Sequence, residues 1–261
     1  MTGYQAIVLE QEGPIARVTL NRPDAANAMN HTMLHELADA AMRCDHAATK
    51  AVVLTGAGRF FSAGGDLRAM ASSPSTRGQY VKSMADDLHR AISTFARMDA
   101  VLITAVNGVA AGAGFSLAVT GDLVLAAESA SFTMAYTAAG LSPDGSSSFY
   151  LPRLVGVRKT HELMLTNRTL SATEALQWGL VTELVDPAGL AARANQLAEK
   201  IASGAKQSAS AVKKLVLMSF ANGLEEQMAL EGRLIAECAD TSDGTEGIDA
   251  FLEKRRPRFA D

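Results

Sequence analysis

Short apolar stretches recur in the first half of the chain at the spacing of strands. Residues 15–20 alternate apolar and polar side chains, which is typical of a half-buried strand, and residues 7–9 offer a partner strand. Residues 51–55, 101–106 and 123–126 are mostly apolar. Such short apolar runs are typical of parallel strands that are covered on both faces.

Apolar residues between these strands recur with the helical period. Asn30 is placed to cap a helix over residues 33–42, and a second helix is expected over residues 84–95. Residues 115–119 also have a helical pattern. Residues 71–79 are rich in Ser, Pro and Gly and are expected to form a mobile loop. The alternation of strand, loop and helix predicts a layered α/β fold.

The last third of the chain is expected to be mostly helical. Ser171 and Glu174 have the spacing of a capping box, and Gly179 follows as a helix stop. Asp186 and Pro187 are the residue types expected at the cap and first turn of the next helix. Three further amphipathic helices are expected over residues 208–220, 223–239 and 245–255.

Composition and charge narrow the class of protein. The chain has 261 residues, of which 48% are hydrophobic and 20% charged, which suits one large domain or one domain with an appendage. The net charge is −4, and residues 254–256 form the one basic cluster, so we expect no nucleic-acid partner. We interpret this cluster as a solvated helix end, with contact to a ligand phosphate as the alternative.

Cysteine usage and hydropathy favour a cytoplasmic location. Cys44 and Cys238 are far apart in the sequence and indicate neither a disulfide framework nor a metal site. Residues 1–13 lack the apolar core of a signal peptide, and no apolar run is long enough to span a bilayer. We therefore expect no membrane partner.

Two glycine-containing loops are the best candidates for chemistry. Residues 63–67 and 107–114 each follow a buried strand and lead toward a helix. Two backbone N–H groups that converge from such loops form an oxyanion hole, in which one donor contributes about 2.7–4 kcal/mol of transition-state stabilisation. The alternative is that the glycines only permit tight turns. A phosphate-binding P-loop is excluded because no Gly-Lys-Ser/Thr follows, and Leu117 stands where a dinucleotide fingerprint needs glycine.

Other polar residues give weaker signals. His31 and His35 lie one helical turn apart, but they lack a third ligand and a His-Glu-x-x-His arrangement, so we expect no metal. His89 and His161 are single histidines on predicted helices and are interpreted as surface or core groups. No Gly-x-Ser-x-Gly motif indicates a serine hydrolase.

An ordered set of segments resembles one enzyme family. From about residue 5 to the C-terminus, the chain resembles the crotonase (enoyl-CoA hydratase/isomerase) superfamily. The segments that carry the resemblance are 21–23, 27–30, 63–67, 107–114, Asp122, 165–168 and 175–181. The resemblance implies an α/β fold, a crotonase-type spiral of β-β-α turns over residues 1–200. It also implies a helical oligomerisation segment over residues 201–261, with a homotrimer or homohexamer.

The same resemblance assigns residues to an acyl-CoA site. It implies that the backbone N–H groups of Gly65 and Ala113 bind the thioester oxygen, with Gly112 and Gly114 beside them. Coenzyme A is then part of the substrate, and no separate cofactor is expected. The implied CoA contacts are Ala26, Asn27, Ala28, Ala63, Asp66, Leu67 and Arg68, with Phe251 and Lys254 of a neighbouring subunit.

The side-chain chemistry departs from the hydratase pattern. Ser116 and Tyr136 stand where hydratases of this family carry two glutamates, and neither is a carboxylate. We expect Tyr136 to line the substrate pocket and Ser116 to pack or hydrogen-bond locally there, with a direct acid/base role as the alternative for each. Asp144 matches a functional aspartate of dienoyl-CoA isomerases, ring-epoxide isomerases of phenylacetyl-CoA breakdown and 4-chlorobenzoyl-CoA dehalogenases. Its alternative is a turn residue, because Pro-Asp-Gly is a turn signature.

Residues 132–180 look closest to the phenylacetyl-CoA pathway isomerases. The resemblance therefore favours double-bond isomerisation, with Asp144 as the proton shuttle. A 2-enoyl-CoA hydratase, an aryl-CoA dehalogenase and a non-catalytic acyl-CoA-binding protein remain as alternatives.

Overall fold

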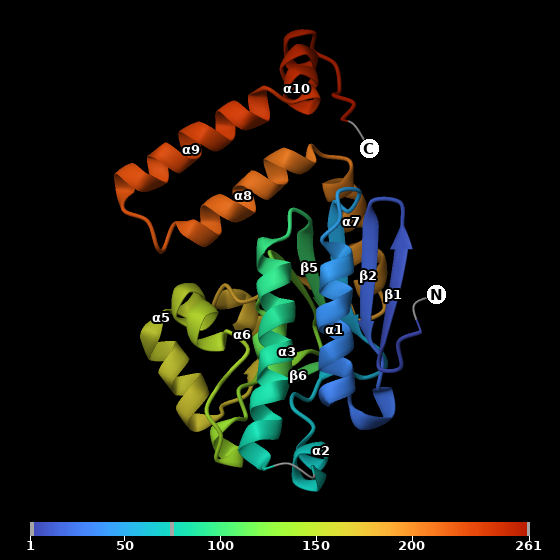
Figure 1. Cartoon of the computed structure of the whole chain (residues 1–261), viewed down its shortest axis with the longest axis vertical. Coiled ribbons are helices and arrows are strands. Elements are labelled where there is room, and N and C mark those ends of the chain that lie inside the picture. The colour runs from blue at the N-terminus through green and yellow to red at the C-terminus, as the bar shows by residue number, and fades with distance from the viewer. Residues whose placement is uncertain (1–2, 74–75, 260–261) are drawn as a thin grey trace.

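Two sheets organise the protein, whose computed structural model describes residues 3–73 and 76–259 (Figure 1). The larger sheet has the strand order β1-β2-β3-β5-β7-β10, and β1 is antiparallel to β2 while the other pairs are parallel. Its strands are β1 (Ile7–Glu12), β2 (Ile15–Leu20), β3 (Ala51–Gly56), β5 (Val101–Val106), β7 (Leu123–Ala127) and β10 (Glu183–Val185). The sequence predicted five of these six strands from their apolar patterns.

A smaller sheet adds one short strand after each of three long ones. Its order is β4-β6-β8-β9, with β4, β6 and β8 parallel and β9 antiparallel to β8. The strands are β4 (Phe60–Ser62), β6 (Val109–Ala111), β8 (Ser131–Thr133) and β9 (Leu170–Ser171). The chain thus passes from β3 to β4, from β5 to β6 and from β7 to β8, which confirms the predicted spiral of β-β-α turns.

Helices cover both faces of the large sheet. Helices α1 and α3 pack along each other, while α7 lies on β3, β5 and β7 (Figure 1). Burial from both sides explains why β3 and β5 are almost wholly apolar. The helices before residue 205 are α1 (His31–Cys44), α2 (Leu67–Ser72), α3 (Arg77–Arg97), α4 (Ala113–Ala118), α5 (Ser147–Thr166), α6 (Ala172–Gln177) and α7 (Leu190–Ala202), with short 3-10 turns at Pro23–Ala25 and Thr137–Ala139.

Two predicted caps are present. The Asn30 side chain accepts a hydrogen bond from the N–H of Met33 at 3.0 Å and so begins α1. Ser171 and Glu174 form a reciprocal capping box at the start of α6. Local polar signals therefore fix these two helix starts.

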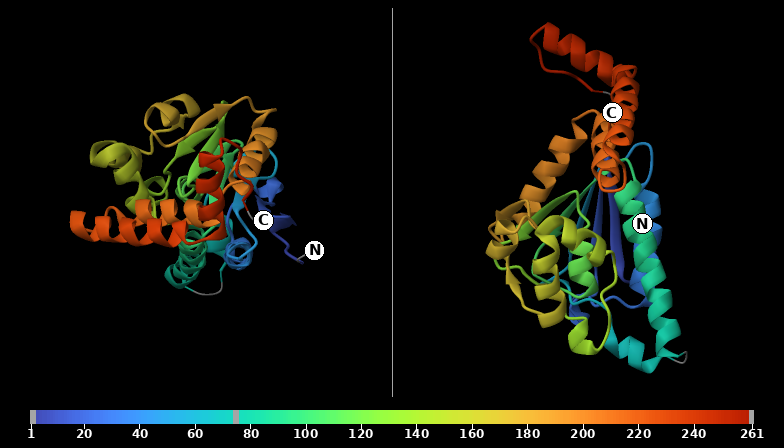
Figure 2. Two further views of the ribbon diagram at one scale, coloured as in Figure 1. Left: turned by 90° about the horizontal axis from the view of Figure 1, so that it is seen from above. Right: turned by 90° about the vertical axis from the view of Figure 1, so that its left-hand side faces the viewer.

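The last three helices extend away from the two sheets. They are α8 (Lys206–Met218), α9 (Leu224–Ala239) and α10 (Ser242–Leu252). Helix α8 contacts α3 and β5, α9 pairs with α8, and α10 contacts α9 (Figures 1 and 2). Large apolar side chains exposed on this part are Val212, Val216, Phe220, Leu224, Met228, Ile235, Ile248, Phe251 and Leu252. Within the described ranges, no helix is both long and apolar enough to cross a membrane.

Three predicted boundaries are wrong. Most of segment 71–79 is helical, because α2 continues to Ser72 and Thr76 caps α3; residues 74 and 75 of this predicted loop lie outside the described residues. Asp186 does not cap α7, since its side chain binds the N–H of Ala188 in a turn and the helix begins at Leu190. The last helix spans 242–252 instead of 245–255, because Thr241 provides its cap.

Candidate active site

The two glycine loops meet because they leave neighbouring strands. Strands β4 and β6 are parallel partners, so their carboxyl ends lie at the same edge of the small sheet. The first loop continues from Ser62 and the second from Ala111. They approach so closely that a Cβ on Gly64 would lie 3.2 Å from the nitrogen of Ala113. Gly64 and Ala113, almost 50 residues apart in the sequence, are thus in van der Waals contact.

The N–H of Gly65 is directed away from Met29, with which Gly65 forms an isolated β-bridge. Met29 donates to the oxygen of Gly64 at 2.7 Å and accepts from the N–H of Asp66 at 2.9 Å. These two bonds flank Gly65 and leave its own N–H on the opposite side. Among the described residues, this N–H has no acceptor.

The N–H of Ala113 is free for a different reason. Gly112 takes a conformation of φ +50° and ψ −124°, and Ala113 then begins α4. The first N–H groups of a helix have no partner within the helix, and Ala113 finds no other acceptor in the described chain. Both free donors, of Gly65 and Ala113, line one cavity of about 440 Å³.

This cavity is largely apolar and contains a single acid. Asp144 is the only carboxylate among the described residues that line it. Arg77 and Lys82 supply positive charge to the wall. The apolar part of the wall is made by Met29, Leu34, Leu67, Met70, Val81, Met84, Leu88 and Leu141. The site therefore combines main-chain donors, one carboxylate and a hydrophobic compartment.

Asp144 lies in a tight turn that is held from several sides. Gly145 and Ser146 both have positive φ angles, of +59° and +64°. The Gly145 N–H donates to Nε2 of His89 at 3.2 Å, and the hydroxyl of Ser147 donates to the oxygen of Asp144 at 2.9 Å. Asp144 is therefore a turn residue of the Pro-Asp-Gly segment and also lines the cavity, so the first does not exclude the second.

Tyr136 and Ser116 form a chain of hydrogen bonds with Asp144. The Tyr136 hydroxyl lies 2.7 Å from Oδ1 of Asp144, and Oγ of Ser116 lies 2.9 Å from the Tyr136 hydroxyl. Burial raises the pKa of Tyr136 well above its usual range, and the Asp144 carboxylate raises it further. Tyr136 is therefore a neutral hydrogen-bond donor at physiological pH.

Comparison with known proteins places these features in a family. The enoyl-CoA hydratase/isomerase family model matches residues 10–261. The chain is 38% identical over 256 residues to a probable enoyl-CoA hydratase of Rhodobacter capsulatus, with 98% of each chain covered. It is 36% identical over 258 residues to the 1,2-epoxyphenylacetyl-CoA isomerase of Escherichia coli, with 97% of each covered. The chain belongs to the enoyl-CoA hydratase/isomerase family.

Solved structures of this family have the same fold. An enoyl-CoA hydratase from Bacillus anthracis superposes with a TM-score of 0.92 at 31% identity, covering 98% of this chain and 99% of that one. An enoyl-CoA hydratase subunit from Geobacillus kaustophilus gives a TM-score of 0.91 at 32% identity, with 99% of both chains covered. The crotonase-type fold inferred from the ordered motifs is confirmed.

Several positions that the resemblance assigns to CoA lie near the cavity in this family member. Ala63 and Leu67 line it. Asp66 caps α2 by accepting from the Ala69 N–H at 3.1 Å and pairs with Arg22 at 3.0 Å, while Arg68 is exposed on α2. These residues connect the first glycine loop to the surface.

The segment over Ala26, Asn27 and Ala28 is hydrogen-bonded to the start of the first glycine loop. Ala26 and Asn27 have φ angles of +53° and +52°, and the N–H of Ala63 donates to the oxygen of Ala26 at 3.0 Å. Asn27 is completely buried, and its amide donates to the oxygens of Ala57 and Phe60. The Asn27 side chain is therefore fully used in holding the backbone.

Four other predicted residues lie outside the cavity. Gly114 packs on β4, where a Cβ would approach the Ser62 oxygen to 2.4 Å, and Ser116 is buried behind Tyr136. Phe251 and Lys254 lie at α10, at the end of the molecule opposite α2 (Figure 1). Phe251 is 83% exposed, and neither residue is among the described residues that line the cavity.

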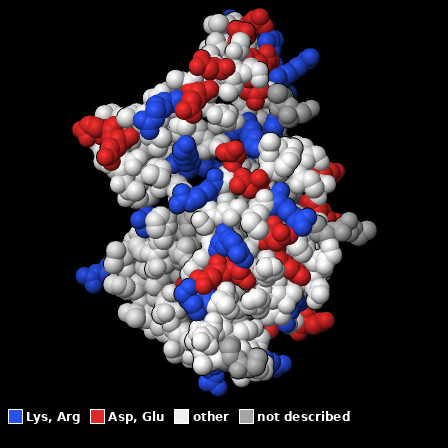
Figure 3. All heavy atoms as spheres, viewed as in Figure 1, with Lys and Arg blue, Asp and Glu red and all other residues white. Residues whose placement is uncertain are grey.

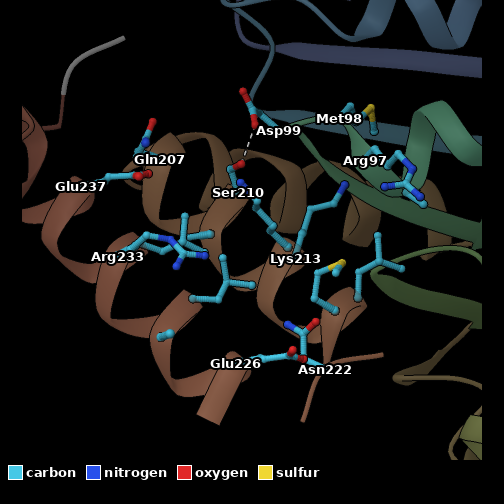
Figure 4. A pocket seen from close by; sticks show the side chains of 18 residues that line it. Arg97, Met98, Asp99, Gln207, Ser210, Lys213, Asn222, Glu226, Arg233 and Glu237 are labelled. Carbon is cyan, nitrogen blue, oxygen red and sulfur yellow. Dashed lines mark hydrogen bonds between the residues drawn. The ribbon is translucent and has the colours of Figure 1, made fainter. Parts of the chain in front are cut away.

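A larger cavity of about 690 Å³ lies between the α8–α9 hairpin and the end of α3. Figure 3 shows the hollow with basic side chains at its edge, and Figure 4 shows Lys213, Arg233 and Arg97 among its wall residues. Two of the wall residues are bonded to each other, since Ser210 donates to Asp99 at 2.5 Å. Neither glycine loop reaches this cavity, so it lacks the main-chain donors that enolate chemistry needs.

Sequence reasoning missed the part played by α3. Val81, Ala85 and Leu88 share one face of this helix with His89, and the three apolar residues line the cavity. The helical spacing of this face was visible in the sequence, but what the face packs against could not be read from neighbouring residues. His31 and His35 instead lie 3.9 and 3.8 Å from Asp87, and within the described ranges no cluster of acidic, His or Cys residues could hold a metal ion.

Proposed function

We propose that this enoyl-CoA hydratase/isomerase family member moves a double bond within an acyl-CoA thioester by proton transfer through Asp144. The observation that carries the proposal is the meeting of two free N–H groups and one carboxylate in a single apolar cavity. An enolate oxygen needs the donors, and a proton shift needs one group that is first a base and then an acid.

In this mechanism the thioester oxygen accepts hydrogen bonds from Gly65 and Ala113. Asp144 removes a proton from the acyl chain, and the electrons of the broken C–H bond move onto the thioester as an enolate. Asp144 then returns the proton to another carbon of the conjugated system. No atom or electron is gained or lost, so the reaction needs no cofactor beyond the CoA of the substrate.

The lining of the cavity suggests an apolar acyl group. Met84, Leu88 and Leu141 stand beside Tyr136 and Asp144 in the wall, where they would exclude water and favour a hydrocarbon chain or ring. The CoA moiety would extend from this cavity along residues 26–28 and 63–68.

We further propose a cytoplasmic homotrimer or homohexamer. In such an assembly, Phe251 and Lys254 of a neighbouring subunit would contact CoA, because they are remote from the cavity of their own chain. The exposed apolar side chains of α8, α9 and α10 support association, since burying them against another subunit would remove them from water.

Hydration of a 2-enoyl-CoA is the second candidate. The relative in Rhodobacter capsulatus is named a probable enoyl-CoA hydratase, and one in Clostridium acetobutylicum, 32% identical, is named a short-chain-enoyl-CoA hydratase. Addition of water requires both activation of water and protonation of carbon. With Asp144 as the only acid among the described wall residues, one group would have to serve both steps, which favours isomerisation.

A panel of enoyl-CoA thioesters incubated in deuterium oxide tests the proposal. Mass spectrometry should detect deuterium uptake or a shifted double bond with the wild-type protein and little of either with Asp144→Asn. Asp45→Asn, at the exposed end of α1, is the control. Undiminished exchange by Asp144→Asn would remove Asp144 from the mechanism. Gain of one D2O, about 20 mass units, would instead identify hydration. Halide release from a halogenated aryl-CoA added to the panel would identify dehalogenation, and tight binding without exchange would identify a non-catalytic protein.

A further inference from the structure

The direction of the hydrogen bonds around Asp144 follows from the number of protons available. In the proposed function Asp144 begins the reaction as a base, and a carboxylate that acts as a base only accepts hydrogen bonds, so the single proton of the Tyr136 hydroxyl must lie on its 2.7 Å contact with Oδ1. The Tyr136 oxygen then has only lone pairs for Ser116. Ser116 therefore donates to Tyr136 at 2.9 Å, in preference to its longer 3.3 Å contact with the Gly112 oxygen.

The Tyr136 ring is held by its own backbone. The residue before it, Ala135, has a φ angle of +57°, and the Tyr136 N–H donates to the Met134 oxygen at 2.7 Å. The Tyr136 main-chain carbonyl oxygen accepts from the N–H groups of Ala139 and Leu141, both at 3.0 Å. The hydroxyl is thus presented from a well-anchored turn, and Tyr136 as a whole is only 9% exposed.

The other carboxylate oxygen of Asp144 is left for the reaction. Oδ1 is occupied by Tyr136, whereas Oδ2 accepts no hydrogen bond from any described residue. The chain of hydroxyls ends at Ser116, which is completely buried. A proton therefore has no route from Asp144 through Tyr136 to solvent, and the arrangement suits holding a charge better than conducting a proton.

We infer that Tyr136 is a positioning residue: its hydroxyl holds Oδ1 of Asp144, directs Oδ2 toward the substrate and favours the ionised carboxylate that begins the reaction. This inference rests on the proposed function, in which Asp144 is the base. Ser116 strengthens the effect because donation to the Tyr136 oxygen polarises the hydroxyl. Ser116 and Tyr136 thus support the single carboxylate of Asp144, whereas hydratases of the family are expected to carry a glutamate at each of these two positions.

The test compares the pH profile of kcat/KM for the wild-type protein and Tyr136→Phe, measured by deuterium exchange into the best thioester of the panel. Loss of the donor should lower kcat by roughly tenfold to hundredfold, the range of one hydrogen bond to a charged group, with little change in KM. The acidic limb should move to higher pH, because the ionised base loses a stabilising partner. A purely structural role would lower activity without moving this limb.

Replacing Tyr136 by 3-fluorotyrosine provides a second measurement that keeps the ring and its packing. The fluorinated hydroxyl is a stronger donor, so the acidic limb should move in the opposite direction, to lower pH. Tyr80→Phe is the matched control, since the Tyr80 hydroxyl has no hydrogen-bond partner among the described residues and lies outside the cavity. It should behave as the wild type.

The outcomes separate the inference from the proposed function. If Asp144→Asn is inactive while both Tyr136 variants keep the wild-type kcat and pH profile, Tyr136 does not position Asp144 and the inference fails alone. If Asp144→Asn keeps full exchange activity, the proposed function itself fails. Opposite shifts of the acidic limb in the two Tyr136 variants support both.

Discussion

Gly64 and Ala111 are in such close contact that a methyl group on Gly64 would lie 2.6 Å from the Ala111 carbonyl oxygen. Gly64 also has a φ angle of +89°, a conformation that residues with a Cβ rarely adopt. One glycine therefore lets the first loop bend and also allows it to touch the second. The distance between the free N–H groups of Gly65 and Ala113, which we propose as oxyanion donors, depends on this contact.

Gly64→Ala should disrupt the site more than the fold. The added methyl must push the two loops apart, and loss of one oxyanion donor costs about 2.7–4 kcal/mol of transition-state stabilisation, so kcat should fall by roughly 100- to 1,000-fold. Kinetics on the best thioester of the panel would measure it. Gly232→Ala on α9 is the control, because nothing lies within 4 Å of its added Cβ. Equal kinetics of the two variants would contradict the role of the contact.

Much of the scaffold was predictable because its signals are local. The apolar runs at 51–55 and 101–106 became β3 and β5, since a strand covered on both faces can be recognised from its own residues. The two glycine loops were found because each follows such a strand. Their convergence came from the family resemblance, and the pairing of β4 with β6 now explains it physically.

The connections within the site were not predictable, because they join distant parts of the chain. His89 and Gly145 are 56 positions apart, and neither shows in its own neighbourhood that the other will meet it. The bonds from the buried Asn27 amide to the oxygens of Ala57 and Phe60 also join distant positions, and its predicted contact with CoA stays a prediction. Asp186-Pro187 is a good helix-start signal, yet the hydrogen bond to Ala188 makes it a turn.

The bond between His89 and Gly145 predicts a specific pattern of rescue. In His89→Leu the Gly145 N–H loses its acceptor, and the turn that carries Asp144 should become mobile. Loss of this one hydrogen bond should lower kcat by roughly tenfold. In His89→Gln the side-chain oxygen can replace Nε2 and restore most of the activity. His161→Leu, at an exposed position on α5, is the control. Glutamine that performs no better than leucine would argue against the bond.

The pKa of Asp66 predicts a pH-dependent contribution to stability. Partial burial raises this pKa, but the N–H of Ala69 and the Arg22 guanidinium lower it more, so it lies below its usual value of 3.8. A carboxylate whose pKa is lower in the folded than in the unfolded protein stabilises the fold at pH values above its unfolded-state pKa. This contribution is lost as the pH falls through its folded-state pKa. Urea unfolding of the wild type and Asp66→Asn should differ by less than about 1 kcal/mol above pH 5. The difference should shrink below about pH 4; a constant difference down to pH 3 would contradict the assignment.

Lys213 joins α8 to the rest of the protein through three polar contacts, of which the two to carbonyl oxygens are buried. Its ammonium donates to the oxygens of Phe95 and Ala100 at 3.0 and 2.5 Å and lies 2.9 Å from Oδ2 of Asp122. The Lys213 side chain is 6% exposed. These partners lie at the end of α3, at the start of β5 and before β7, so one residue connects three elements.

Lys213→Met should therefore loosen the helical hairpin. Methionine fills the space but removes the donor of two carbonyl oxygens and leaves Oδ2 of Asp122 with only the Leu102 N–H, which should lower the free energy of unfolding by about 1–3 kcal/mol. Limited proteolysis should cut the α8–α9 segment faster, because the hairpin makes few other contacts with the sheets. Lys214→Met, on the exposed side of the same helix, should change stability by less than about 0.5 kcal/mol. Equal effects of the two substitutions would mean that α8 is held by packing alone.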